Sequence, residues 1–137
     1  MKYFFIIISL FLISCKKENV NKTSKKEIPT EQFQNLDVVA LNKKIAGLNL
    51  KPKQIMKIHY PIKVGNEGKE SIKIDVLNLP SGKTEVTLIH DFIMDDAIKA
   101  EKHFLVLNKK NEVITLQKNW QCWQDRGHQD FSIEKCN

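Results

Sequence analysis

The sequence lacks a segment that could cross a lipid bilayer, and it lacks the short motifs of common hydrolases. Its N-terminal apolar run, Tyr3 to Ile13, is eleven residues long, whereas a spanning helix needs about 20. The chain contains no Gly-x-Ser-x-Gly and no His-Glu-x-x-His, the patterns of a serine-nucleophile elbow and of a zinc protease. These absences argue against a membrane-spanning helix and give no support to a familiar catalytic apparatus.

Arginine is nearly absent, although the chain is basic. The 137 residues carry a net charge of +6 but a single arginine, Arg126. From Thr30 onward, 16 Lys plus Arg stand against 14 Asp plus Glu, so most of the excess charge precedes this point. A nucleic-acid-binding surface needs a basic patch interleaved with aromatic residues. We therefore expect no nucleic-acid partner.

The residues that end the apolar run predict a lipid anchor. Leu12-Ile13-Ser14-Cys15 resembles the lipobox of bacterial lipoproteins, Leu-x-[Ser/Ala/Gly]-Cys, in which the cysteine is lipidated and the preceding residues are removed. The resemblance implies a signal peptide over residues 1–14, with the lipid attached at Cys15. Two or more acyl chains, such as palmitate, hold a protein stably on a membrane. The alternative is an ordinary secreted protein whose Cys15 is unmodified.

Residues 15–29 are expected to be the lipidated cysteine and a disordered tether. Residues 16–29 hold five lysines, two glutamates and few apolar side chains, too few to form a core. A flexible coil of this length averages about 20 Å end to end. Lys16 stands where an aspartate retains many lipoproteins in the inner membrane. The resemblance thus favours the outer membrane, on its periplasmic face or at the cell surface.

Residues 30–137 are predicted to form a single α+β domain. Thr30 can cap a first helix that ends at Gly47, and Pro52 suits the first turn of a second helix. The apolar positions of the first helix recur at intervals of three and four residues, namely Phe33, Leu36, Ala40, Leu41 and Ile45. In the second segment Met56, Ile58 and Tyr60 would also suit a strand.

The rest of the domain shows the period-two alternation of strands. The expected strands are Ile72 to Val76, Val86 to Met94, His103 to Leu107 and Val113 to Leu116, with a hairpin turn at Asn108 to Asn111. Helices followed by sequential strands predict one or two N-terminal helices packed on a small antiparallel β-meander. We expect His90 to be a hydrogen-bonded core residue, and Asp95 and Asp96 to lie in a solvated turn.

Three side chains near the C-terminus could form a metal site, a thiol active site or a closed loop. Cys122, His128 and Cys136 are separated by five and seven residues, whereas structural zinc usually takes close cysteine pairs and a fourth ligand. Thiols outside the cytoplasm tend to be oxidised, and lipid on Cys15 leaves an even number of cysteines. We predict a Cys122–Cys136 disulfide and no metal or cofactor, with zinc or free thiols as alternatives.

The same segment holds the residues expected to form a binding surface. Trp120 and Trp123 would be apolar anchors, Arg126 a planar donor, and His128 and Asp130 polar contacts. Trp and Arg are enriched at binding hot spots. The alternative is that tryptophans beside a disulfide belong to the core.

Two motifs near the C-terminus resemble a family of small exported bacterial proteins of unknown function, from about Ala46 to the end. The motifs are Met94-Asp95-Asp96-Ala97-Ile98 with Glu101, and Trp120-x-Cys122-Trp123 followed by Arg126-Gly127-His128-Gln129-Asp130-Phe131-Ser132-x-Glu134-x-Cys136. The resemblance supports a closed loop and names no ligand.

The predicted function is a lipid-anchored, non-catalytic envelope protein that binds a partner, a protein or an envelope polymer, or supports the envelope. One alternative is an envelope hydrolase that uses His128 with Asp95, Asp96 or Asp130, which would need a pocket where these groups converge. The other is an inhibitor of a foreign hydrolase that places the C-terminal loop in its cleft.

Overall fold

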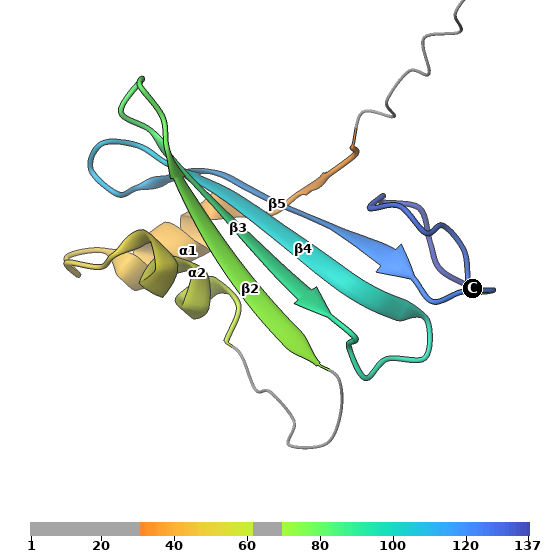
Figure 1. Ribbon diagram of the computed structural model, residues 1–137. Helices are drawn as coiled ribbons and strands as arrows, with labels where there is room; N and C mark the ends of the chain where they lie inside the picture. Colours follow the sequence, from red (N-terminus) through yellow and green to blue (C-terminus); the bar gives the residue numbers. More distant parts are fainter. Residues whose placement is uncertain (1–30, 62–69) are drawn as a thin grey trace, which may run out of the picture.

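The computed structural model describes residues 31–61 and 70–137 (Figure 1). The predicted signal peptide, the lipid attachment at Cys15 and the tether up to residue 29 lie outside the described residues. Within the described ranges no helix has the length and apolar content needed to span a membrane.

The domain has two short helices and a five-stranded antiparallel sheet (Figure 1). The elements are β1 (Gln34–Asn35), α1 (Val38–Ile45), α2 (Pro52–His59), β2 (Ser71–Asn78), β3 (Thr84–Asp91), β4 (Ile98–Leu107) and β5 (Val113–Cys122). The strand order is β1-β5-β4-β3-β2, and every neighbouring pair is antiparallel. The predicted α+β class, with helices first and a meander after them, is confirmed.

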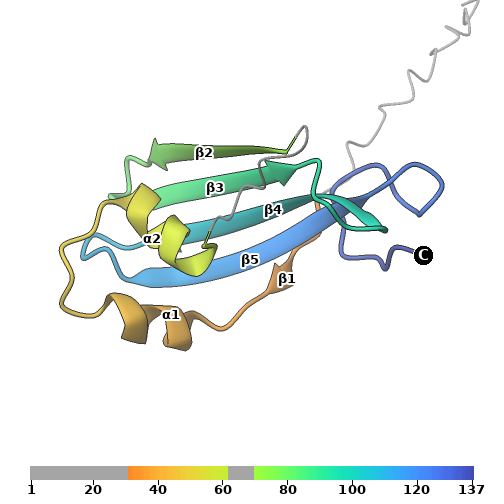
Figure 2. The ribbon, with the colours of Figure 1, turned by 90° about the horizontal axis from the view of Figure 1, so that it is seen from below.

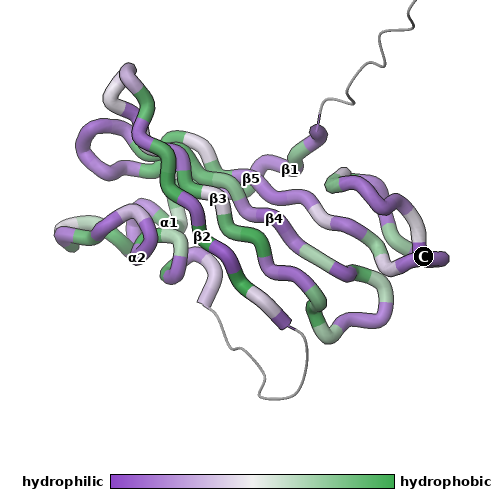
Figure 3. Tube along the Cα trace, in the orientation of Figure 1, coloured by the Kyte–Doolittle hydropathy of each residue, from purple (hydrophilic) through white to green (hydrophobic). Residues whose placement is uncertain are grey.

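Both helices lie on one face of the sheet and cover only one end of it (Figure 2). α1 contacts β5, and α2 contacts β2 and β3. Hydrophobic and hydrophilic residues alternate along most of β2 (Figure 3), and buried and half-buried residues alternate along β3. One set of side chains therefore faces the helices. The buried core beneath the helices consists of Leu41, Ile45, Ile55, Met56, Val86, Leu88, Leu105, Leu107, Val113 and Leu116.

The N-terminal segment differs from the prediction of one helix that follows Thr30. Gln34 and Asn35 instead pair with Lys118 and Gln117 of β5, and the helix begins only at Val38. Asp37 caps it, because its side chain accepts a hydrogen bond from the Val39 amide at 2.8 Å. The free edge of β5 provides main-chain partners for this segment, which the sequence pattern alone did not reveal.

The second segment is a helix, so the alternative of a strand is wrong. Pro52 occupies its first turn, where its missing amide hydrogen is not needed. The Lys51 amide donates to the Gln54 side chain at 2.7 Å, and Ile55 and Met56 are buried.

The strands differ from their predicted bounds where loops and bulges intervene. β3 ends at Asp91, because Phe92 has a φ of 56° and turns the chain, so Met94 lies in a loop. β4 begins at Ile98, earlier than predicted, and pairs with a longer β5. The hairpin turn at Asn108 to Asn111 is confirmed, with Asn111 at a φ of 60°.

Lys102 of β4 contacts both Glu31, the first described residue, and the C-terminal loop. Its side chain lies on the face of the sheet away from the helices. Its ammonium forms an ion pair with Glu31 and lies 4.1 Å from the centre of the Phe131 ring. Phe33 lies beside Phe104 of the same face, with ring centres 6.0 Å apart. The start of the domain and the C-terminal loop therefore contact the same side chain.

Candidate functional site

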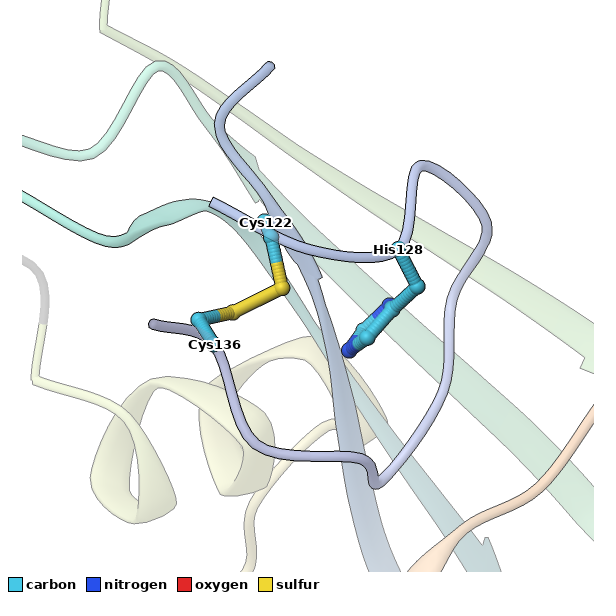
Figure 4. A group of neighbouring side chains, drawn as sticks. All are labelled: Cys122, His128 and Cys136. Carbon is cyan, nitrogen blue, oxygen red and sulfur yellow. A yellow bond between two sulfur atoms is a disulfide. The ribbon is translucent and has the colours of Figure 1, made fainter. Parts of the chain in front are cut away.

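The C-terminal loop is closed by a disulfide between Cys122 and Cys136, as predicted (Figure 4). Cys122 is fully buried at the end of β5, and the two Cα atoms are 5.6 Å apart, within the usual range for this bond. Neither Cys122 nor Cys136 therefore has a free thiol in this form of the protein.

Main-chain hydrogen bonds fix the loop against β5. Trp120 and Ser132 exchange two such bonds, each 3.0 Å long. The loop therefore pairs with the same edge of β5 that β1 pairs with. The Cys122 amide donates to the His128 carbonyl at 3.0 Å, and the Asn137 amide donates to the Arg126 carbonyl at 2.7 Å. The loop is an ordered element of the fold.

The two tryptophans anchor this loop to the rest of the domain. The Trp120 indole N–H donates to the Glu134 carbonyl at 2.9 Å, and that of Trp123 to the Asp95 carbonyl at 2.8 Å. The Trp123 ring also packs on Phe92, with centres 6.0 Å apart. Both indoles are half-buried, so each combines a structural contact with a partly exposed ring.

His128 and the nearby aspartates do not form an acid–base pair. The His128 ring nitrogens lie 2.7 Å from the Asp130 carbonyl and 2.8 Å from the Glu134 carbonyl. Within the described ranges no hydrogen bond or ion pair joins His128 to the carboxylate of Asp95, Asp96 or Asp130. The hydrolase alternative thus gains no support from the geometry.

Asp95 has a local structural role. Its carboxylate accepts hydrogen bonds from the Ala97 and Ile98 amides at 2.8 and 2.7 Å. These bonds lower the pKa of Asp95, because they stabilise its charged form. Asp95 and Asp96 lie in an exposed turn, as expected.

The β3–β4 loop and the C-terminal loop together present an exposed surface of mixed character. Met94 is 76% exposed and Phe92 is 37% exposed, and Trp123 joins their loop to the disulfide-closed one. In the described part of the chain the exposed Arg126 guanidinium has no hydrogen-bond or ion-pair partner. We refer to Phe92, Met94, Trp123 and Arg126 as the loop-end surface.

A chain of polar side chains lies where α2 meets the sheet, and no pattern in the sequence predicted that these residues meet. The Tyr60 hydroxyl lies 2.8 Å from His90 Nδ1 and donates to Glu101 Oε2 at 3.2 Å. Glu101 Oε2 lies 3.3 Å from His103 Nε2, and His103 Nδ1 lies 3.0 Å from His59 Nε2. We refer to these five residues as the polar network. His90 is the hydrogen-bonded core residue that its place on an apolar strand face predicted.

The network extends from His90 to Glu70. The Glu70 carboxylate lies 3.2 Å from His90 Nε2, although this contact lacks the alignment of a hydrogen bond. Both side chains are at least nine-tenths buried. The partners are far apart in sequence, so only the folded sheet brings them together.

Burial and hydrogen bonding set the charges of the network. Burial, reinforced by the positive charges of nearby His103, Lys44 and Lys118, lowers the pKa of His59 to about 4, so this ring is neutral at pH 7. The hydrogen bond from His103 lowers the pKa of Glu101, which is therefore ionised. An ionised carboxylate only accepts, so His103 Nε2 carries the proton of that bond.

A cavity of about 550 Å³ lies at the opposite end of the sheet from the disulfide. It opens between the α1–α2 connection and the β4–β5 hairpin, and its lining includes Asn42, Leu48, Leu50, Ile55, Asn111 and Ile114. None of the side chains predicted to form the functional site lines it.

No protein-family model, curated protein or solved structure matches this chain. The two resemblances noted in the sequence therefore rest on their motifs alone.

Proposed function

We propose that the protein is a lipid-anchored, non-catalytic binding module of the bacterial cell envelope, and that the loop-end surface contacts its partner. The lipobox-like Leu12 to Cys15 supports the anchor, and the charge of the tether is compatible with an anionic membrane surface. The outer membrane is the proposed location.

The observation that carries the proposal is the exposed Arg126 guanidinium, which has no partner among the described residues. It lies on the loop whose Trp123 packs on Phe92. A planar guanidinium with five donors suits a carboxylate or an aromatic face. Met94 and Phe92 are exposed apolar side chains that would add contact area on the neighbouring loop. The disulfide and the Trp123 contacts hold these groups in place, so little ordering entropy is lost on binding.

The structure changes the proposed role of several predicted contact residues. Trp120 and His128 use their polar atoms within the loop, so we assign them to its support. Asp130 is exposed and stays a predicted contact. Phe92 joins the surface because its ring packs on Trp123, and Met94 joins it because it is exposed in the same loop. The partner we propose is a protein or envelope polymer that carries carboxylates.

Affinity capture from envelope extracts with paired variants tests the proposal. Met94→Asp places a negative charge on the loop-end surface, and Val39→Asp makes the same change on α1, where Val39 is 69% exposed. A partner retained by the wild type and by Val39→Asp, but lost from Met94→Asp, supports the surface. Equal retention by all three proteins contradicts it.

The anchor needs a separate test, because a binding surface does not require a lipid. Labelled palmitate should enter the protein, and Cys15→Ser should abolish both the labelling and the membrane association. Labelling that survives Cys15→Ser would remove the lipoprotein proposal. The proposal that the loop inhibits a foreign hydrolase has no specific observation in its favour and stays a prediction.

A further inference from the structure

We infer that the C-terminal loop has a second, reduced state in which Cys122, Cys136 and His128 together bind one Zn²⁺ ion. This inference concerns the loop after its disulfide is broken. It does not depend on the proposed binding function.

The first observation is that the three donors already converge. One ligand atom from each of Cys122, His128 and Cys136 lies within 4.8 Å of the other two (Figure 4). Zn–S bonds of about 2.3 Å and Zn–N bonds of about 2.0 Å at tetrahedral angles place such donors about 3.5 to 3.8 Å apart. No other three side chains in the described part of the chain meet this spacing. Once the S–S bond is broken, rotation of the cysteine side chains can bring the sulfurs to that separation.

The second observation concerns the hydrogen-bond partners of His128. Its two ring nitrogens lie 2.7 and 2.8 Å from the carbonyls of Asp130 and Glu134, and carbonyls only accept. Coordination of a metal through one ring nitrogen would replace one of these two contacts, and the other nitrogen could keep its hydrogen bond to a carbonyl. A hydrogen bond from the second ring nitrogen to a carbonyl commonly orients a histidine that binds a metal.

The charge and exposure of the site also suit zinc. The two thiolates offset the double positive charge of the ion, and the imidazole ligand adds no charge. No uncompensated charge is therefore placed beside the buried Cys122. His128 and Cys136 are half-buried, which leaves a fourth position for a water molecule. A Cys₂His set with an open fourth position is a known zinc arrangement.

The conversion needs an external dithiol reductant. Its two S–H groups supply two electrons and two protons and become a disulfide, while the Cys122–Cys136 bond breaks to give two thiols. Zn²⁺ then replaces both thiol protons, which pass to solvent. The loop remains closed, by two S–Zn bonds in place of one S–S bond.

The test uses the full chain carrying Cys15→Ser, so that Cys122 and Cys136 are its only thiols. The protein is purified in detergent and compared in its oxidised form and after reduction with a phosphine. Co²⁺ is titrated as the spectroscopic probe and then displaced with Zn²⁺. The reduced protein should bind one equivalent with a sulfur-to-cobalt charge-transfer band, release two protons per zinc and protect both thiols from alkylation. The oxidised protein should show none of these signals.

A histidine variant tests the third ligand, and a second histidine variant is its control. His128→Gln should weaken zinc binding by about ten-fold or more, whereas His59→Gln, outside the loop, should leave it unchanged. A reduced wild-type chain that binds no more metal than the oxidised chain overturns the inference. Full affinity in a folded His128→Gln also overturns it, because the site would then be a simple dithiol. Proton release and thiol protection are measured without a substitution at His128, so the inference can be contradicted even if that variant does not fold.

Discussion

The two ends of the sheet are stabilised by different kinds of interaction. At one end α1 and α2 cover a buried apolar core, and at the other a disulfide and main-chain hydrogen bonds hold the C-terminal loop on β5. The polar network lies between them, along the inner face of β3 and β4. Figure 1 shows the helices and the loop at opposite ends of the strands. Each end should therefore respond to a different perturbation.

The largest effect is expected at the helix-covered end. Met56 is fully buried, and Met56→Ala removes a core side chain and leaves a cavity. We expect the free energy of unfolding to fall by about 2 to 5 kcal/mol, measured by chemical denaturation. Lys57→Ala, at the exposed neighbouring position, is the control and should change it by about 0.5 kcal/mol or less. A cost below about 1 kcal/mol for Met56→Ala would show that α2 contributes little to the core.

The next effect is expected at the loop end. Replacing Cys122 and Cys136 together by alanine removes a closed loop of about 15 residues, worth about 3 kcal/mol in the chain-entropy model. Hydrogen exchange should show that the Trp120 and Cys122 amides lose protection, while the amides of α2 keep theirs. Uniform loss of protection along the whole sheet would mean that the two ends are not independent.

A smaller, pH-dependent effect is expected where the polar network joins α2 to the sheet. The pKa of His59 is about 4 in the folded protein, whereas an unperturbed histidine has a pKa of 6.5. The unfolded chain therefore binds more protons between these pH values. The free energy of unfolding should therefore fall as the pH is lowered from about 6.5 to 4. Partial exposure of the ring reduces the size of the effect. His59→Gln should have a flatter profile in this window, and an equally steep one would assign the dependence to other groups.

The smallest effect on stability is expected on the loop-end surface. Arg126→Lys keeps the charge but loses the planar fork, and the guanidinium has no partner to lose among the described residues. The melting temperature should stay within about one or two degrees, while partner capture weakens. A lower melting temperature with unchanged capture per folded molecule would make Arg126 a scaffold residue.

The strands and the disulfide were predictable because local rules determine them. Period-two alternation located the faces of β2 and β3, and Pro52 marked the start of α2. The number of cysteines, together with the expected export of the domain, was enough to predict the Cys122–Cys136 pair. These inferences needed a periodicity, a backbone preference or a count, all of which the sequence contains.

The network and the short strand β1 were not predictable, because they depend on register between distant segments. His90 and Glu101 face each other across β3 and β4, and Tyr60 reaches both only because α2 ends above them. Alternation shows which face a side chain occupies but not which residue lies opposite. The same limit explains Met94, which alternation placed on a strand and which the turn at Phe92 moves to the loop-end surface.

The side chain of Lys102 has a consequence for how the domain is oriented. Because its ammonium contacts both Glu31 and Phe131, the point where the chain enters the domain lies beside the closed loop. With the anchor proposed at Cys15, this end of the molecule would lie nearest the lipid. The helices would then point outward, away from the bilayer. A partner bound at the loop-end surface would lie close to the headgroups, so a large one would have to approach sideways along the membrane plane.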